Sequence, residues 1–412
     1  MNNSMKSIDQ MNAALGLSAA ILFYLKFFHE KKGNKSAQIE SLAGKDAKDH
    51  YLLAGDIGGT TSRLALFSIQ STEALLIKYY ANEDHLSNGE KFEDAIILPF
   101  LKSCFNEPFL LGKDASAVSI TACLACAGPV KDNHVFMINI GNGVYLDGNS
   151  IEKNESSLLS CIGRVKIVND FVGMGYGALD LDLDEEAIEL TKGSKDLIDP
   201  MGPKVCVGAG TGLGECYLTL SSLNPEAGYE CYPSEGGHVE FVPRTEVEID
   251  LLHFLKTKFG QKHRVSAERV VSGKGLANVY EFLAMKFPER VEKNVHEEFL
   301  AAGDMQGKVI SVNATPGSLC YEAMIIFASA YGSEVGSAAL KFIPTGGLYV
   351  VGGLAPKNLK YIQGEDSPFM KAYQDKGRVS PLLETVPLFA VLNEDLGLRG
   401  ARVCALRVSL KI

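Results

Sequence analysis

Two glycine-rich turns carry the residue types that can hold phosphate groups. They are Asp56-Ile-Gly-Gly-Thr-Thr61 and Gly208-Ala-Gly-Thr-Gly-Leu-Gly214. Glycines let backbone N–H groups converge on an anion, and threonine hydroxyls add further donors. A carboxylate beside bound phosphate is tolerable where it holds hydrated Mg²⁺, which is the role we expect for Asp56. The first turn alone is explained as well by a plain glycine hairpin, because short motifs often match by chance.

Asp170 is the candidate catalytic base. It follows the apolar run 165–168, and in α/β sheets ligands gather beyond the carboxyl ends of strands. A carboxylate at that point can accept a proton from a substrate hydroxyl as the hydroxyl oxygen attacks phosphorus. Asp and Asn are also good helix caps, so position alone favours an N-cap for a helix beginning near Phe171.

Three further stretches suit a small polyol and a nucleotide. Glu235 and His238 flank two glycines; a carboxylate can accept bonds from two vicinal hydroxyls, and a neutral imidazole can donate or accept. Their spacing also occurs in metal sites, but no further His or Cys cluster supports zinc. Glu268, by itself, is typical of a helix start. The pair Gly352-Gly353 allows a purine or ribose to lie on the backbone, or forms a tight strand-to-helix turn.

Composition limits the class of protein. A length of 412 residues suggests two or three domains, and 46% hydrophobic with 22% charged residues is typical of globular proteins. The net charge of −10, without a dense Lys/Arg stripe after residue 50, argues against nucleic-acid or anionic-membrane surfaces. An anionic substrate must therefore be held by backbone donors and metal. Nine cysteines without a disulfide framework indicate a reducing compartment, so we expect a cytoplasmic protein.

The order of apolar runs predicts an α/β fold. We expect strands at 52–54, 64–67, 75–80, 118–127, 165–168, 205–208, 216–220 and 348–351, and helices at 92–103, 245–259 and 322–342. Residues 322–342 are apolar almost all round, which indicates a buried helix in a soluble protein. The two phosphate turns lie about 150 residues apart, which suggests two similar half-domains facing one nucleotide. Residues 287–312 are charged and then turn-rich, and we expect a peripheral excursion.

Residues 1–50 differ from the rest of the chain. The apolar run 13–28 is shorter than the ~20 residues that span a bilayer. We expect an appended helix rather than a membrane anchor, and membrane contact is not expected. Flanking positive charge leaves membrane or organelle association through this run as the alternative.

Taken together, these motifs resemble the bacterial-type (group A) glucokinases of the hexokinase/actin-like ATPase superfamily. Besides the two turns, the ordered set contains Asn169-Asp170-Phe171, Ser234-Glu-Gly-Gly-His-Val239, Ser266-Ala-Glu-Arg269, Val271-Ser-Gly-Lys-Gly-Leu276 and Gly352-Gly353. The individual turns are weak signals, but their order and spacing are specific, and the match runs from about residue 52 to the end. The resemblance implies a two-domain, ribonuclease H-like α/β fold with a mixed five-stranded sheet in each domain. The expected parts are an extension at 1–50, a small domain at 51–180 with 392–412, and a large domain at 181–391, with the ligand cleft between the domains.

The resemblance also implies a role for each matching residue. Asp170 is the base for the sugar 6-hydroxyl. The other hydroxyls fall to Asn169, Glu235, His238, Glu268 and Asn139, the last with neighbours that differ from the family pattern. The resemblance implies that the phosphates and Mg²⁺ are bound by Asp56, Gly58, Gly59, Thr60, Thr61, Gly210, Thr211 and Gly212. It implies that the adenosine is bound by Gly352 and Gly353.

The predicted activity is ATP-dependent phosphorylation of D-glucose to glucose 6-phosphate, and we expect a homodimer. The alternatives are a kinase for another hexose such as mannose or glucosamine, and a non-catalytic actin-like or sugar-sensing ATP-binding protein. The sequence departs from the family pattern at residues 1–50, at Glu215 directly after the second turn, and in the length of 287–312. Relatives with structural zinc use a cysteine-rich cluster after their His, whereas here only Cys231 precedes His238. That subgroup is disfavoured.

Overall fold

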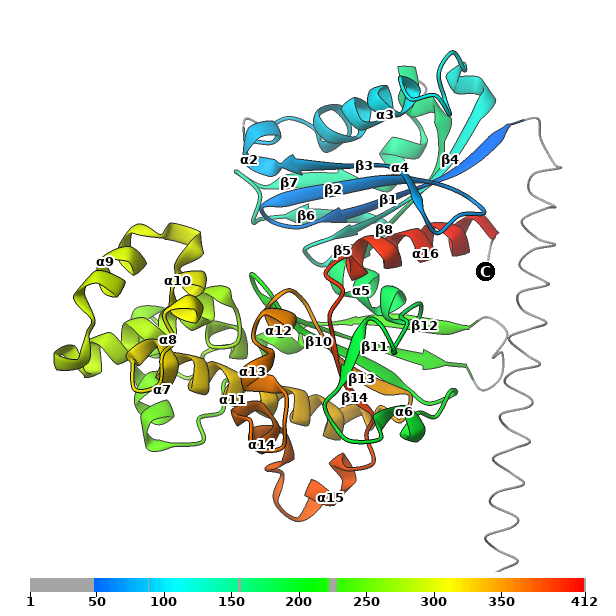
Figure 1. The fold of residues 1–412 in the computed structure, drawn as a ribbon. Helices are drawn as coiled ribbons and strands as arrows, with labels where there is room; N and C mark the ends of the chain where they lie inside the picture. The colour runs from blue at the N-terminus through cyan, green and yellow to red at the C-terminus, as the bar shows by residue number, and fades with distance from the viewer. Residues whose placement is uncertain (1–47, 88, 155–156, 222–227, 411–412) are drawn as a thin grey trace, which may run out of the picture.

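The computed structural model describes residues 48–87, 89–154, 157–221 and 228–410. Two mixed sheets dominate it, with helices between them and on their outer faces (Figure 1). The expected α/β fold class is confirmed. The apolar run 13–28 lies outside the described residues, so the helix expected there stays a prediction.

The first sheet has five strands in the order β3-β2-β1-β4-β8. Their bounds are β1 Asp49–Ile57, β2 Thr61–Ser68, β3 Ala74–Ala81, β4 Val118–Cys126 and β8 Ile162–Asn169. Strands β1, β4 and β8 run parallel, and Ile57, Cys126 and Asn169 lie in register at their carboxyl ends. This register brings the first phosphate turn and the Asn169-Asp170 pair to the same edge of the sheet. The outer face is covered by η1 Glu93–Ile97 and α3 Leu98–Phe105, near the short α2 Asn82–His85.

A small three-stranded sheet lies against the free edge of β8. It consists of β5 Val130–Lys131, β6 His134–Met137 and β7 Val144–Asp147, followed by α4 Gly148–Glu152. Asn133 Nδ2 donates to the Val165 carbonyl at 2.9 Å, and Asn133 Oδ1 accepts from the Ile167 N–H at 2.8 Å. One side chain therefore continues the hydrogen bonding of the strand that leads into Asp170.

The second sheet has the order β12-β11-β10-β13-β14-β9. Its strands are β9 Ala187–Glu189, β10 Lys204–Ala209, β11 Leu213–Leu220, β12 Tyr229–Ser234, β13 Gly347–Val351 and β14 Leu388–Val391. The sheet has one strand more than the five expected, namely β9 at the edge. Three residues are too few to show the alternating pattern by which strands are recognised in sequence.

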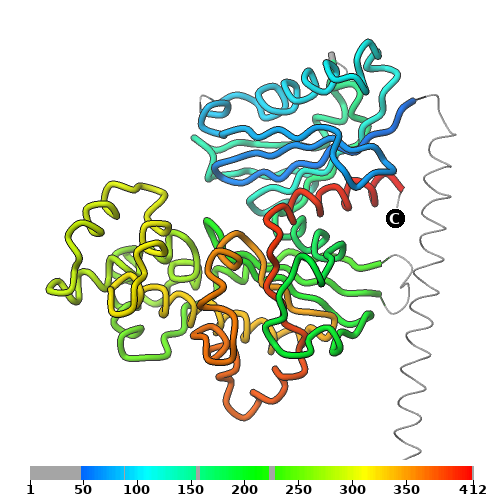
Figure 2. The backbone as a smooth tube through the Cα atoms, in the orientation of Figure 1, coloured from blue at the N-terminus to red at the C-terminus, as the bar shows by residue number. Residues whose placement is uncertain are grey.

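Two helices form a layer between the sheets. They are α5 Asp170–Ala178 and α16 Leu396–Leu410, and the chain crosses from β14 back to the first sheet to form α16 (Figure 2). A buried apolar cluster around them includes Leu52 and Cys123 from the first sheet and Cys206 and Phe389 from the second. The two sheets thus share one core across this layer.

The remaining helices lie outside the layer between the two sheets. They are α6 Ser194–Leu197, α7 Glu246–Lys258, α8 Gly273–Lys286, α9 Lys293–Ala301, α10 Gln306–Val312, α11 Leu319–Phe342, α12 Leu354–Lys357, α13 Leu359–Ile362, α14 Pro368–Gln374 and α15 Ser380–Leu383. Of these, α11 and α12 contact strand β10 of the second sheet. Residues 287–312 were expected to be rich in turns, but two helices, α9 and α10, occupy most of that stretch. They lie at the periphery, as expected (Figure 1). Their helical pattern was hidden because both are short and Gly303 separates them.

Helix α11 is long and apolar enough to cross a membrane by length and composition. In the structure 67% of its most apolar window is buried. A Cβ on Gly332 would lie 2.0 Å from the Phe369 carbonyl oxygen of α14, so the two helices touch backbone to backbone. The helix is the centre of the large apolar core, as the sequence predicts.

We predict that Gly400→Ala loosens the layer between the sheets. A Cβ on Gly400 of α16 would lie 1.7 Å from the Gly173 carbonyl oxygen of α5, and backbone atoms cannot give way cheaply. Urea denaturation should show a loss of about 1–3 kcal/mol in the free energy of unfolding, the usual cost of overpacking. The matched control is Gly163→Ala, whose Cβ would meet nothing within 4 Å. Equal stability of the two variants would contradict the close contact.

Candidate active site

The first phosphate turn joins β1 to β2 and is fixed from one side by Asn82. This buried asparagine donates from Nδ2 to the carbonyls of Gly58 at 2.8 Å and Gly59 at 3.2 Å. Its Oδ1 accepts from the Ser62 hydroxyl at 2.6 Å, and its own N–H donates to the Thr60 carbonyl at 2.8 Å. Asn82 therefore holds the carbonyl groups of the turn. Sequence reasoning missed it, because it follows a strand with no motif around it.

The second phosphate turn joins β10 to β11 and is tied to helix α8 and to Glu268. The Gly210 carbonyl accepts from the Gly273 N–H at 2.9 Å, at the start of α8. Glu268 Oε2 accepts from the Leu213 N–H at 3.0 Å, and a Cβ on Gly212 would lie 2.5 Å from the same oxygen. Glu268 was expected among the sugar residues, and the structure places one of its oxygens on the phosphate turn. Glu268 is therefore hydrogen-bonded to the second glycine turn, whatever else it binds.

Gly352 and Gly353 end β13 beside the second turn. Strand β13 runs parallel to β10, with Val351 in register with Gly208. Gly352 has a positive φ of 84°, and its Cβ would lie 2.7 Å from the Ala209 carbonyl oxygen. Both observations require glycine. The adenosine residues expected from sequence thus adjoin the expected phosphate residues.

Asn169, and not Asp170, is the N-cap of α5. Asn169 Oδ1 accepts from the Phe171 N–H at 2.9 Å, and its Nδ2 donates to the Gly128 carbonyl at 3.2 Å. Asp170 is the first helical residue, and its Oδ1 accepts from the Phe171 N–H at 3.0 Å. The cap interpretation that competed with a catalytic role for Asp170 therefore applies to its neighbour.

Burial, with a smaller contribution from the negative charges of Asp56 and Glu235, raises the pKa of Asp170 to about 7, although the hydrogen bond from the Phe171 N–H lowers it. A carboxylate whose pKa lies near neutral pH is well suited to take a proton and return it to solvent. Strongly shifted carboxylates in clefts are typical of active sites, although structural ion-pair networks also produce them.

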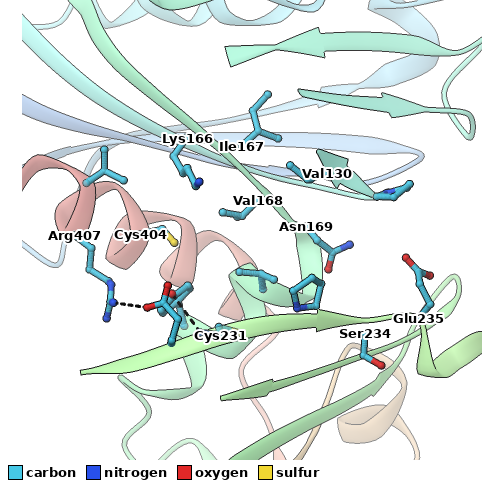
Figure 3. A pocket seen from close by; sticks show the side chains of 16 residues that line it. Val130, Lys166, Ile167, Val168, Asn169, Cys231, Ser234, Glu235, Cys404 and Arg407 are labelled. Carbon is cyan, nitrogen blue, oxygen red and sulfur yellow. Dashed lines mark hydrogen bonds and ion pairs between the residues drawn. The ribbon is translucent and has the colours of Figure 1, made fainter. Parts of the chain in front are cut away.

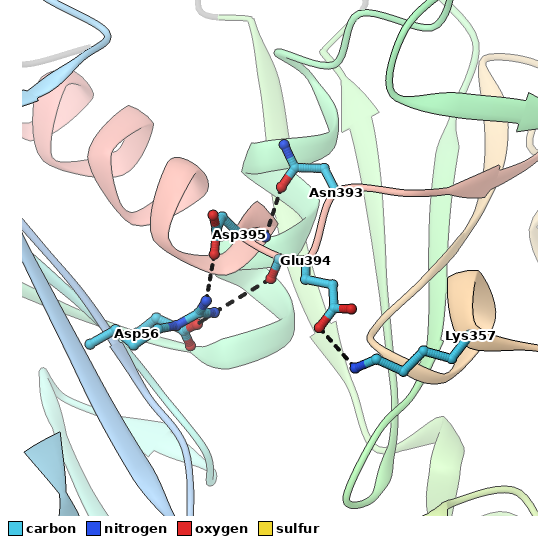
Figure 4. A network of polar contacts seen from close by, with 6 residues as sticks. Asp56, Lys357, Asn393, Glu394 and Asp395 are labelled. Atoms are coloured by element: carbon cyan, nitrogen blue, oxygen red, sulfur yellow. Dashed lines mark hydrogen bonds and ion pairs between the residues drawn. The ribbon is translucent and has the colours of Figure 1, made fainter. Parts of the chain in front are cut away.

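Asp56 is ion-paired with Arg63, which lies directly opposite on β2 (Figure 4). The guanidinium also contacts Asp395 Oδ1 at 2.6 Å, and the neighbouring Glu394 pairs with Lys357 of α12 at 3.0 Å. Arg63 was not predicted, because a single arginine after a glycine turn gives no local signal. The network joins the first phosphate turn to the segment that connects the two sheets.

The residues present fit one Mg²⁺ ion held mainly by the nucleotide. No group of three or more His, Cys, Asp or Glu side chains in the described part of the chain could enclose a metal ion. Mg²⁺ in kinases is usually bound through one or two carboxylates, with phosphates and water completing its shell. Asp56, near the carboxyl end of β1, is the carboxylate that fits this role.

Glu235 and Asn169 face a shared cavity between the two sheets (Figure 3). The cavity, of about 460 Å³, is lined by β8, β12, α5 and α16. Glu235 and His238 are exposed, and Glu235 Oε2 lies 3.8 Å from His238 Nε2. Asn139 is not among the residues that line this cavity; it lies beside the first turn, where a Cβ on Gly59 would be 3.4 Å from Asn139 Cβ. The structure thus brings Glu235 to Asn169 and places Asn139 beside the first phosphate turn.

Two sheets with glycine turns at the ends of β1 and β10, and a layer of helices between the sheets, define the two-domain fold of the hexokinase-like class. The chain belongs to the glucokinase family within this class. The family model described as Glucokinase matches residues 53–408.

Known relatives support this assignment. A glucokinase from Synechocystis is 37% identical over 365 residues, covering 86% of this chain and 97% of the relative. A glucokinase from Nostoc is 37% identical over 369 residues, covering 87% and 99%. Among solved structures, a Balamuthia mandrillaris glucokinase in complex with glucose has a TM-score of 0.68 at 22% identity and covers 90% of this chain and 98% of its own. At that identity the structural likeness concerns the fold.

We predict that Asp170→Asn stabilises the protein at alkaline pH. An acid whose pKa is raised by folding makes the folded state lose stability as pH rises from its unfolded pKa, near 4, to its folded pKa, near 7. A shift of about three pKa units corresponds to at most about 4 kcal/mol.

Urea denaturation measures the free energy of unfolding of the variant and of the parent at each pH. The variant's value minus the parent's should be larger at about pH 8 than at about pH 4, by up to about 4 kcal/mol. A difference that does not change with pH would show that Asp170 has an ordinary pKa.

Proposed function

We propose that the chain is an ATP-dependent glucokinase, which transfers the terminal phosphoryl group of ATP to the 6-hydroxyl of D-glucose. The observation that carries the proposal is the position and chemistry of Asp170. It lies at the carboxyl edge of the first sheet, near the turn at 56–61, with a pKa of about 7. Family membership supports the choice of reaction, since the curated relatives are named glucokinases.

In the proposed mechanism, Asp170 in its ionised form accepts the proton of the 6-hydroxyl. The sugar oxygen then forms its bond to the terminal phosphorus of ATP, the bond from that phosphorus to the bridging oxygen breaks, and ADP leaves. Backbone N–H groups of the two glycine turns stabilise charge on the transferring group. Mg²⁺, held with Asp56, would neutralise phosphate charge; Arg63 would then keep its contact with Asp395.

We propose that the hexose is held by Asn169, Glu235, His238 and Glu268, with Asn139 as a further contact. The hydrogen bond from the Leu213 N–H to Glu268 supports a coupling of sugar and phosphate binding through one carboxylate. Closing the cleft over both substrates would exclude water that otherwise hydrolyses ATP.

We propose that two domains move relative to each other when the cleft closes. The small domain consists of residues 51–180 with 392–412, and the large domain of residues 181–391. Within the joining segment, Asp395 pairs with Arg63 of the first sheet, and Glu394 pairs with Lys357 beyond the second sheet. Neighbouring residues thus attach to opposite sides of the cleft, which supports a hinge at this point. A cytoplasmic homodimer remains our expectation, and the nine free, buried cysteines agree with a reducing compartment.

A coupled assay of ADP release across glucose, mannose, glucosamine and other hexoses tests the function. We predict the highest kcat/KM for glucose. Replacing Asp170 by Ala should lower kcat by about 10²–10⁴-fold, the usual contribution of a general base, with ATP binding largely retained. Preference for another hexose would identify a different sugar kinase. ATP binding without ADP release on any hexose would favour a sensor or actin-like protein. Near-parental turnover in the variant would exclude Asp170 as the base.

We predict that Glu235→Gln raises the KM for glucose by about 5–100-fold, because a hydrogen bond to a charged acceptor is lost. The kcat value should change much less, since this carboxylate is proposed to hold hydroxyls and not the reacting oxygen. The matched control is Glu240→Gln, an exposed glutamate on the same stretch that pairs with Arg264 at 3.8 Å. An unchanged KM in the Glu235 variant would remove it from the sugar site.

A further inference from the structure

A buried pair of carboxyl groups lies behind the second phosphate turn. Glu215, on β11, is only 2% exposed and faces Glu334 of α11 within hydrogen-bonding reach. Within the described residues, Glu215 Oε1 and Glu334 Oε1 are both buried and neither has a hydrogen-bond partner. Two buried carboxylates in contact are very unfavourable, whereas one shared proton satisfies both oxygens.

Charges around the pair indicate that Glu215 carries this proton. Lys341 Nζ lies 3.7 Å from Glu334 Oε1, and Lys376, which follows α14, also stabilises the charge of Glu334. The other titratable group of α11 nearby is Tyr331, whose hydroxyl donates to the Val207 carbonyl at 3.2 Å. Burial and, after it, the charge of Glu334 raise the pKa of Glu215 to about 7, although Lys341 lowers it.

The carboxyl group of Glu215 lies directly under residues 234–238, the segment predicted to bind the sugar, which we call the sugar loop. A Cβ on Gly236 would lie 2.1 Å from Glu215 Oε2, so the backbone of Gly236 rests on this side chain. Strand β11 also pairs Glu215 with Ser234, whose hydroxyl accepts from the Gly236 N–H at 3.0 Å. Gly236 follows Glu235 and precedes His238 by two residues. The position of its backbone on Glu215 therefore sets where both side chains lie.

We propose that Glu215 is a positioning residue for sugar binding: its protonated carboxyl group, hydrogen-bonded to Glu334, supports Gly236 and thereby holds Glu235 and His238. This inference rests on the proposed function. When Glu215 loses its proton, two carboxylates repel each other in a buried space. Gly236 must then move, or water must enter. Sugar affinity therefore falls as pH rises above neutrality, while the phosphate turns keep their backbone contacts.

Glucose binding in an Asp170→Asn background tests the proposal. That background removes the titration of Asp170 and stops turnover, so calorimetry reports the Kd directly. Between about pH 7 and pH 8.5 we expect the Kd to rise by about tenfold, following the ionisation of one group with a pKa near 7. Adding Glu215→Gln should make the Kd constant within about twofold, since the amide is always neutral and can donate to Glu334.

An equal rise of Kd in both variants, or no rise in either, would overturn the role of Glu215. Both carry the same Glu235 and His238, so the titration of those groups cancels in the comparison. If neither variant nor the parent binds or phosphorylates any hexose, the proposed function itself fails.

Infrared spectroscopy tests the shared proton without the double variant, so its result does not depend on how that variant folds. The Asp170→Asn protein should show a protonated carboxyl C=O band at about pH 6 that disappears by about pH 9, as a group of pKa near 7 requires. Absence of the band at about pH 6 would overturn the shared proton, and with it the proposal, whatever the calorimetry of the double variant shows.

Discussion

The proposed role of Asp170 requires its carboxyl group to ionise at a buried position, where a charge is unfavourable. The packing around Asp170 determines how unfavourable that ionisation is. It begins a helix packed between two sheets, where burial and the carboxylates of Asp56 and Glu235 oppose its ionisation. Asn169 takes over the capping of that helix, and glycines in α5 and α16 bring the two helices into backbone contact. The side chain that we propose as the base therefore begins a closely packed helix, and burial raises its pKa to about 7. A more exposed carboxylate at this point would be a weaker base.

The same cleft has to accept an anionic nucleotide although acidic residues surround it. Asp56, Asp170, Glu235 and Glu268 all lie around the expected substrates, and the only cation paired at the first turn, among the described residues, is Arg63. Backbone N–H groups and a bound cation must then supply most of the positive potential. Glu215 adds one more carboxyl group, which packs directly under Gly236. Glu268 accepts a hydrogen bond from the Leu213 N–H.

Much of the fold was readable from sequence because it depends on local patterns. Apolar runs beside glycine turns gave β1, β2, β10 and β11, and an apolar stretch with two glycines gave the buried helix α11. The order of motifs also indicated the family, which the family model confirms. Asn169 and Glu235 line one cavity, and the roles expected for them from sequence stay predictions.

The features that sequence could not give depend on partners far away in the chain. Arg63 meets Asp395, Asn82 holds a turn more than twenty residues earlier, and Glu215 faces Glu334. Contacts between residues so far apart in the chain leave no local sequence pattern from which they could be predicted. Glu215 was visible only as an unexpected charge after a glycine turn, and its meaning required the helix behind it. The short strand β9 and helices α9 and α10 were missed because they are too brief to show a period.

The most direct test is the titration of Asp170 itself by ¹³C NMR of the side-chain carboxyl groups, assigned by its absence from the Asp170→Asn spectrum. The account predicts a midpoint at about pH 7 in the free protein. A midpoint near the ordinary value of 3.8 would contradict it, because Asp170 would then be neither desolvated nor tuned to act as the base.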